Sequence, residues 1–167
     1  GILTVKLASP VRWDRIISFL HPFADMRDKG YQVALSIYAI GSGKLFGLGL
    51  GQSVQKYSYL PEPYNDFIFA IVCEELGFVG AVAVMALFLA LILRGARIAL
   101  NAPDVYGTLT ATGIVAQLAI QTVLNIAVAT SSVPNTGVAL PFFSYGGTSI
   151  MTLLLEMGVL LNISRYS

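Results

Sequence analysis

The sequence is poor in cysteine, histidine and charge. Among its 167 residues there are one cysteine, Cys73, and one histidine, His21, with 10 lysines and arginines and 9 aspartates and glutamates. A single cysteine cannot form an intrachain disulfide, and His21 has no carboxylates at the spacing of a metal site. The sequence contains no run of lysine or arginine, which argues against a nucleic-acid partner.

The low charge accompanies long apolar runs. Hydrophobic residues make up 56% of the chain and charged residues only 11%, which is too apolar for an ordinary soluble domain. The run from Leu76 to Leu93 is long enough to cross a bilayer core. Further apolar runs follow over 106–130 and 150–163. The sequence therefore predicts an all-α integral membrane protein with about three full spans.

These runs predict the order of segments along the chain. We expect the end of a truncated membrane helix over 1–8, followed by a large extracytoplasmic loop with short amphipathic helices over 9–65. A membrane helix over 66–93, a cytoplasmic loop over 94–105 and a second membrane helix over 106–130 come next. The chain ends with an extracytoplasmic re-entrant loop over 131–147, a membrane helix over 148–164 and a cytoplasmic tail over 165–167. Short loops with arginine mark the cytoplasmic side, and Arg94 and Arg97 provide that signal. The long outer loop holds more basic residues, but long loops translocate largely regardless of charge.

One mouth of the first complete span carries three carboxylates. Two prolines stop any helix before Tyr64, and Asn65 or Asp66 can cap a helix that starts directly afterwards. Asp66, Glu74 and Glu75 then lie at or just inside the membrane. An ionisable group costs roughly 2.5–3.5 kcal/mol at a helix centre and less near the interface. Two interpretations stay open: a functional cluster, or a cap at Asp66 with glutamates that face water.

A glycine-rich stretch precedes this mouth, at Gly41, Gly43, Gly47, Gly49 and Gly51. It is not a Walker A loop, because Leu45 follows Lys44 where serine or threonine is needed. It does not follow a strand, so a dinucleotide fingerprint is not indicated. The glycines supply backbone that other groups can approach closely. With Lys44 and Lys56 on either side, the stretch is open to two interpretations: a site for a lipid-linked phosphate, or no site at all.

Polar residues also occur inside the later spans. Gln117, Gln121 and Asn125 recur every four residues and so share one helix face. In lipid such a face contacts other helices or a wet cavity, and helix–helix hydrogen bonds are the simpler explanation. Glu156 lies in the middle of the last span, and we expect it to pair with a polar group on another helix.

The segment over 131–147 is too apolar for a free loop and too rich in glycine and proline for a helix. Irregular backbone at membrane depth survives only against protein or a water-filled cavity. We therefore expect this segment to re-enter the membrane and to pack near the Asp66 mouth.

Several longer motifs support a family assignment. They are Gly30-Tyr31-Gln32, Gly47-Leu48-Gly49-Leu50-Gly51-Gln52-Ser53, Leu60-Pro61-Glu62, Asn65-Asp66-Phe67-Ile68-Phe69-Ala70, Glu74-Glu75-Leu76-Gly77-Phe78-Val79-Gly80, Pro134-Asn135-Thr136-Gly137, Leu140-Pro141-Phe142 and Ser144-Tyr145-Gly146-Gly147-Thr148-Ser149. In this order they resemble the SEDS family of bacterial cell-envelope proteins, which comprises FtsW, RodA and SpoVE. The Asn65-Asp66 pair, with Gln52-Ser53 and Lys56-Tyr57 upstream, is more similar to the FtsW/SpoVE branch. The sequence departs from the family's pattern at Lys44, where glycine is common, and at Pro63-Tyr64, which precede Asn65.

The resemblance implies a fold and a location. Family members are polytopic helical bundles of about ten membrane helices in the bacterial cytoplasmic (plasma) membrane. This chain resembles their C-terminal portion, so we expect a fragment that is inactive alone because its cavity lacks walls.

The resemblance also implies an activity, peptidoglycan glycosyltransfer in cell division or sporulation. The family polymerises lipid II at the outer face of the cytoplasmic membrane, and its essential aspartate matches Asp66, which we assign as the general base. We assign substrate binding to Lys56, Glu62, Ser144, Gly146 and Gly147. Lys56 is the nearest basic candidate for the leaving pyrophosphate but can equally be a plain loop lysine. Glu62 either holds a cation or braces the loop.

Cofactors, partners and rival functions complete the expectations. No cofactor is certain, and a divalent cation, Mg²⁺ or Mn²⁺, with unknown ligands stays open. The implied partners are lipid II, a class B penicillin-binding protein transpeptidase, divisome or sporulation proteins, and the membrane. The rivals are a lipid II flippase and a non-catalytic scaffold that docks a transpeptidase.

Overall fold

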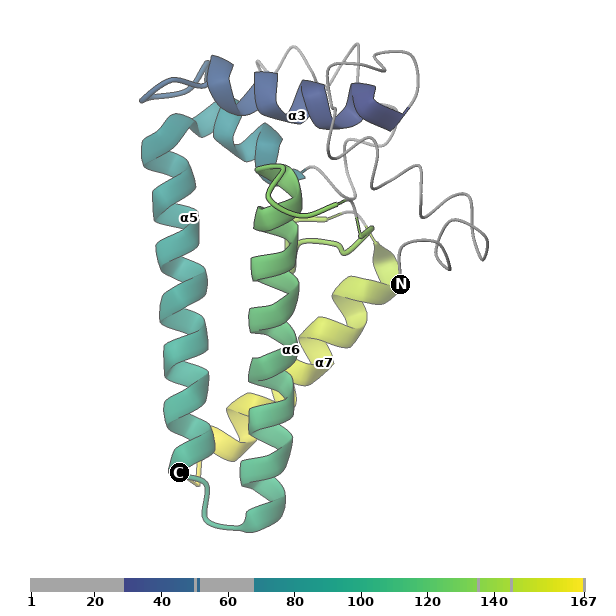
Figure 1. Ribbon diagram of the computed structural model, residues 1–167. Coiled ribbons are helices and arrows are strands. Elements are labelled where there is room, and N and C mark those ends of the chain that lie inside the picture. Colours follow the sequence, from purple (N-terminus) through teal and green to yellow (C-terminus); the bar gives the residue numbers. More distant parts are fainter. Residues whose placement is uncertain (1–28, 50, 52–67, 135, 145, 167) are drawn as a thin grey trace, which may run out of the picture.

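The computed structural model describes residues 29–49, 51, 68–134, 136–144 and 146–166. These residues form four helices, α3 (Lys29–Ser42), α5 (Ile68–Leu100), α6 (Val105–Ala129) and α7 (Gly147–Ser164), with no strand among them (Figure 1). The last three are long and apolar enough to cross a membrane. The predicted all-α membrane fold is confirmed.

Helices α5 and α6 form an antiparallel hairpin and lie side by side in Figure 1. The Val115 side chain of α6 packs directly against α5 at Gly95, where an added Cβ would lie 2.5 Å from Val115 Cγ2. Small residues at helix contacts allow this close approach inside membranes. Ile98 and Ala111 extend the contact, and Leu160 of α7 joins the same buried cluster.

The structure corrects the predicted end of the first complete span. The sequence predicts a helix to Leu93 and a loop over 94–105, but α5 continues to Leu100 and only residues 101–104 connect it to α6. Arginine is a good helix former, and its long side chain carries its charge away from the apolar surface. Arg94 and Arg97 therefore extend the helix. The boundaries of the next two helices differ by one residue at most: α6 covers 105–129 and α7 covers 147–164.

Helix α5 is broken near its start. Gly77 has φ 69° and ψ −168°, a backbone conformation that is essentially restricted to glycine. The break separates residues 68–76, which lie beside α3 at one end of the bundle, from the long segment that follows (Figure 1). This break is not predicted from the sequence.

Helix α3 lies across the same end of the hairpin (Figure 1). Ala34, Leu35 and Ala39 are buried, and the Ser36 hydroxyl donates a hydrogen bond to the Ala129 carbonyl oxygen at 3.3 Å. Tyr38, on the other side, is exposed. This pattern agrees with the short amphipathic helices that the sequence predicts within 9–65.

The irregular segment between α6 and α7 packs against the start of α5. Leu140 is 1% exposed and shares a buried cluster with Phe69 and Val72. Phe142 and Phe143 stack near Phe88, with ring centroids 6.5 and 6.1 Å away. We expect this packing against protein, because irregular backbone at membrane depth survives only against protein or a water-filled cavity.

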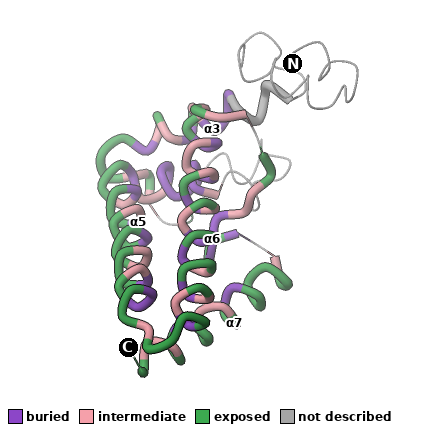
Figure 2. The backbone as a smooth tube through the Cα atoms, turned by 60° about the horizontal axis from the view of Figure 1, so that its bottom comes forward, coloured by how far each residue is buried: buried purple, intermediate pink, exposed green. Residues whose placement is uncertain are grey.

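The outer surfaces of the long helices are apolar and exposed. Leu87 and Leu93 of α5 and Leu155 and Leu161 of α7 are each more than half exposed. In Figure 2 the exposed residues of α5 follow the side that faces away from α6. Such surfaces are stable in contact with lipid or with further helices.

Candidate functional site

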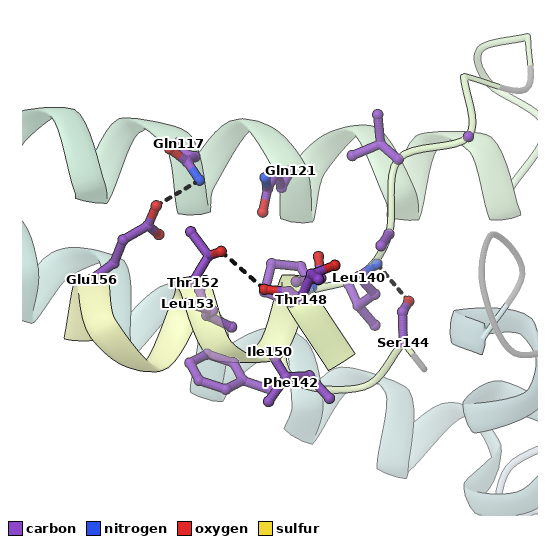
Figure 3. Close-up of a pocket in the computed structure, with 15 residues that line it drawn as sticks. Gln117, Gln121, Leu140, Phe142, Ser144, Thr148, Ile150, Thr152, Leu153 and Glu156 are labelled. Atoms are coloured by element: carbon purple, nitrogen blue, oxygen red, sulfur yellow. Dashed lines mark hydrogen bonds between the residues drawn. The ribbon is translucent and has the colours of Figure 1, made fainter. Parts of the chain in front are cut away.

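A polar cavity lies between α6 and α7, beneath the irregular segment that connects them (Figure 3). The two helices that bound it meet near Leu160 and diverge toward the start of α7 (Figure 1). Its volume is about 480 Å³. We call it the polar wedge, and its lining is Gln117, Gln121, 137–142, Ser144, 148–150, Thr152, Leu153 and Glu156.

A hydrogen bond between two membrane helices closes the deep end of the polar wedge. Gln117 Nε2 of α6 donates to Glu156 Oε1 of α7 at 3.0 Å (Figure 3). The expectation that Glu156 pairs with a polar group on another helix is confirmed. The pair is also the kind of interhelical hydrogen bond that holds membrane helices together.

Gln121 and Asn125, which share one face of α6 with Gln117, have different roles. Asn125 is 1% exposed, and its Nδ2 donates to the Val138 carbonyl oxygen at 2.8 Å. Gln121 points into the polar wedge between them (Figure 3). One predicted face therefore contacts a helix, a cavity and an irregular segment in turn, and a helix–helix hydrogen bond explains the Gln117 contact.

Ser144 tightens the irregular segment. Its hydroxyl oxygen accepts a hydrogen bond from the Leu140 backbone N–H at 2.8 Å, and the side chain is 5% exposed. Between them, Phe142 has a positive φ of 66°. Ser144 lines the polar wedge, as a predicted substrate-binding residue should, but this hydrogen bond also gives it a structural role.

The predicted substrate-binding glycines lie at the start of α7. Gly146 is the N-cap residue and Gly147 the first helical residue. Neither is among the residues that line the polar wedge. An added Cβ at Gly147 would meet no atom within 4 Å, so packing among the described residues does not demand glycine there.

Three predicted site residues, Asp66, Lys56 and Glu62, lie outside the described residues. The two other carboxylates of the predicted mouth are described. Glu74 is 1% exposed, so the interpretation that it faces water is wrong. Glu75 is partly buried, and its Oε1 is buried without a hydrogen-bond partner among the described residues.

The hydroxyls of α7 that line the polar wedge were not predicted from the sequence. Thr148, Thr152 and Glu156 stand four residues apart and so share one helix face. The same four-residue spacing identified the polar face of α6, and it could have identified these residues of α7. Thr152 Oγ1 donates to the Thr148 carbonyl oxygen at 2.9 Å, so its proton is used within the helix.

The lining chemistry restricts what the polar wedge can bind. It offers amides, hydroxyls, backbone carbonyls and one carboxylate, and none of its described lining residues is basic. Such a lining suits hydroxyl and amide groups and disfavours an unpaired anion. No group of three metal-ligating side chains occurs among the described residues, and Asp66 and Glu62 lie outside them.

The fold and the cavity first define a class: a multi-pass helical membrane protein with a polar cavity at one end of the bundle. The whole chain, residues 1–167, matches the family model of FtsW, RodA and SpoVE, described as cell cycle protein. The chain therefore belongs to the FtsW/RodA/SpoVE family, as the resemblance implies.

Curated relatives agree with this assignment. Stage V sporulation protein E of Bacillus subtilis (strain 168) is 53% identical over 167 residues, which cover 100% of this chain and 46% of that protein. A probable peptidoglycan glycosyltransferase FtsW of Geobacter sp. (strain M18) is 43% identical over 164 residues, 98% of this chain and 45% of that protein. The chain thus spans about half the length of these relatives.

Solved structures share the fold. One is a chain from a study of the structural coordination of polymerization and crosslinking by a peptidoglycan synthase complex. It matches with a TM-score of 0.75 and 28% identity, over 97% of this chain and 44% of that one. An aspartate-to-alanine mutant of the rod shape determining protein RodA of Thermus thermophilus matches with a TM-score of 0.60 and 36% identity. That match covers 79% of this chain and 40% of the RodA chain.

Proposed function

We propose that this chain forms part of a peptidoglycan glycosyltransferase that polymerises lipid II at the outer face of the bacterial cytoplasmic membrane. The observation that carries the proposal is its 43% identity, over 98% of the chain, to a probable peptidoglycan glycosyltransferase FtsW. The 53% identity to a sporulation protein supports cell division or sporulation as the setting. The partners would be a class B penicillin-binding protein transpeptidase and other divisome or sporulation proteins.

Asp66 would act as the general base in this reaction. Its carboxylate takes the proton from a sugar hydroxyl of the acceptor while that oxygen attacks the anomeric carbon of the donor. The bond from the anomeric carbon to the pyrophosphate oxygen breaks, and the prenyl pyrophosphate leaves with the electron pair. A single displacement of this kind inverts the anomeric centre. The leaving group needs positive charge, which Lys56 or a divalent cation would supply.

The polar wedge would bind the neutral saccharide part of the substrate. Its amides and hydroxyls can exchange hydrogen bonds with sugar hydroxyls and acetamido groups. Its described lining has no cation to balance a pyrophosphate, so that group would bind nearer Lys56. Leu140, which lines the wedge, packs in one cluster with Phe69, three residues after Asp66. The proposed binding site and the proposed base would therefore be neighbours.

The test is polymerisation of labelled lipid II by the full-length protein that contains this chain, purified with a transpeptidase partner whose own active site is disabled. The native protein is compared with Asp66→Asn and with Asp104→Asn. Asp104 is an exposed aspartate in the turn at the other end of the hairpin and is the matched control. We expect glycan from the native protein and the control and none from Asp66→Asn. Full activity in Asp66→Asn would overturn the assignment.

One observation favours a second function, movement of lipid II across the membrane. The polar wedge extends from the irregular segment down to Glu156 in the middle of α7, and polar groups at that depth suit a translocation path. A flippase would move labelled lipid II between the leaflets of vesicles even with Asp66 replaced. A polymerase would make glycan in detergent, where the two leaflets do not exist.

A further inference from the structure

Three amide side chains share one face of α6, and two of them are engaged within the protein. Gln117 Nε2 donates to Glu156 Oε1 at 3.0 Å, and Asn125 Nδ2 donates to the Val138 carbonyl oxygen at 2.8 Å. Gln121 lies between them, and its side chain makes no hydrogen bond to any residue that the structure describes. Gln117 therefore holds α7, Asn125 holds the irregular segment, and Gln121 is the amide of this face that stays free for a ligand.

The amide of Gln121 points into the polar wedge (Figure 3). The residue is partly buried and lies eight residues before the end of α6, about 12 Å along the helix axis. The backbone of α6 cannot serve this amide, because the N–H and C=O groups there are bonded within the helix. A polar group away from bulk water is unfavourable unless it is hydrogen-bonded, so a ligand group that enters the wedge gains by binding Gln121.

Two side chains of α7 that line the wedge across from Gln121 accept hydrogen bonds rather than donate them (Figure 3). Thr152 uses its hydroxyl proton on the Thr148 carbonyl oxygen at 2.9 Å, so its hydroxyl oxygen offers only lone pairs to a ligand. An ionised Glu156 is likewise an acceptor. A ligand that satisfies this part of the lining therefore carries N–H or O–H donors for α7 and an acceptor for the Nε2 of Gln121.

The lining combines this polar chemistry with apolar side chains. Val138 and Leu153 line the same cavity, and none of the described lining residues is basic. A simple hydroxyl gains nothing from the apolar surface, and an anion would lack a counter-charge. An acetamido group has a carbonyl acceptor, an N–H donor and a methyl group, so it matches the amide of Gln121, the acceptors of α7 and the apolar surface together.

We propose that Gln121 recognises the acetamido group of an N-acetylated sugar in the polar wedge. This inference rests on the proposed glycosyltransferase function and adds a specificity-determining residue to it. Gln121 Nε2 donates to the acetamido carbonyl oxygen, the acetamido N–H donates to an acceptor of α7, and the methyl group packs against Leu153. A site built to hydrogen-bond a substrate group discriminates against an analogue that lacks this group, because its own polar group is then left unpaired.

The experiment measures kcat and KM of the full-length protein for lipid II and for two analogues, each with a hydroxyl in place of the acetamido group on one of the sugars. Selectivity is kcat/KM for lipid II divided by kcat/KM for the analogue. For one analogue we expect a native selectivity of about 10-fold, the effect of one or two hydrogen bonds. Gln121→Met keeps the length of the side chain and removes the amide. In this variant kcat/KM for lipid II should fall by about the same factor, and the selectivity should approach one.

Gln117→Met is the matched control, because it makes the same replacement on the same face of α6, at an amide that is engaged with Glu156. We expect it to lower stability, and any loss of kcat/KM to fall equally on lipid II and the analogue, so that selectivity stays native. Gln121→Asn covers the case in which Gln121→Met does not fold. It keeps the amide one methylene further back, so its selectivity should lie between the native value and one. Membrane insertion and the melting temperature in detergent report folding for every variant.

Three outcomes would overturn this role of Gln121. They are native selectivity in folded Gln121→Met, a native selectivity near one for both analogues, and an equal loss of selectivity in Gln117→Met. If water alone binds Gln121, the variant changes the rates with lipid II and with the analogue alike, which is the first outcome. Absence of glycan from the native protein is a different result, because it removes the glycosyltransferase function itself and this inference with it. The native protein is therefore assayed first with lipid II.

Discussion

Ser144 and Ser149 both face the polar wedge, but they are held differently. Ser144 is buried and accepts a hydrogen bond from the Leu140 N–H, whereas Ser149 is exposed. A hydroxyl that satisfies a buried backbone donor is costly to remove, because the donor is left without its partner.

We expect Ser144→Ala to lower the free energy of unfolding by about 1–3 kcal/mol. Ser149→Ala, on the same wedge, should change it little, because surface substitutions usually stay within about 0.5 kcal/mol. The measurement is unfolding of the purified protein in mixed detergent micelles. Equal stability of the two variants would show that the Leu140–Ser144 hydrogen bond does not hold the irregular segment.

The Gln117–Glu156 pair gives a second prediction at this scale. Interhelical hydrogen bonds in membrane proteins average about 0.6 kcal/mol and reach about 1.7. A double-mutant cycle with Gln117→Ala and Glu156→Ala should give a coupling energy in this range. Glu156→Gln keeps an oxygen that can accept the bond and should retain part of the coupling. A coupling energy of zero would show that the two side chains do not interact in the membrane.

Among whole elements, the long helices were the most predictable and the break in α5 the least. Apolar runs alone indicate α5, α6 and α7, because a bilayer imposes their length. Gly77 alone does not indicate a break in the helix, since a single glycine inside an apolar helix is common in membranes. Its partners lie about 30 residues earlier, in the loop after α3, and only the folded chain brings them together.

The glycines before Leu50 were interpreted correctly in part. Their sequence indicated backbone that another group approaches closely, and a lipid-linked phosphate was one candidate for that group. In the structure the backbone of α5 occupies this position at Gly43 and Gly47. Sequence alone could not choose between these partners, because glycine permits close approach by any group.

The α5–α6 contact yields a prediction for a helix pair. Gly95→Ala should destabilise the protein by about 1–3 kcal/mol, because the new methyl group meets Val115 Cγ2. Gly113→Ala should be neutral or stabilising by up to about 1 kcal/mol, since no atom lies within 4 Å and alanine favours helix. The measurement is the melting temperature in detergent of the Gly95→Ala and Gly113→Ala variants, compared with that of the native protein.

A compensating substitution separates crowding from other effects at this contact. Val115→Ala removes the methyl group that the new Cβ would meet. In the double variant Gly95→Ala with Val115→Ala, most of the stability lost by Gly95→Ala should return, because neighbouring sites are not additive. If the two losses simply add, close packing at Gly95 is not the reason for the destabilisation.

For the molecule as a whole, the candidate site lies where three parts of the chain meet. The start of α5, the irregular segment and the polar faces of α6 and α7 converge at one end of the bundle. The sequence indicated the shared polar face of Gln117, Gln121 and Asn125, because their spacing is local, and it indicated that Glu156 pairs with a polar group on another helix without identifying that group. It could not supply the polar wedge, because a cavity depends on how two helices diverge.

The central claim is that the carboxylate of Asp66 removes a proton during glycan polymerisation. The most direct measurement is the initial rate of glycan formation from labelled lipid II in detergent, for the native full-length protein and its Asp66→Asn variant at equal folded amounts. We expect glycan from the native protein and none above background from Asp66→Asn, with native rates in Asp104→Asn. Equal rates in the native protein and Asp66→Asn would contradict it, because the chemistry would then lie elsewhere in the fold.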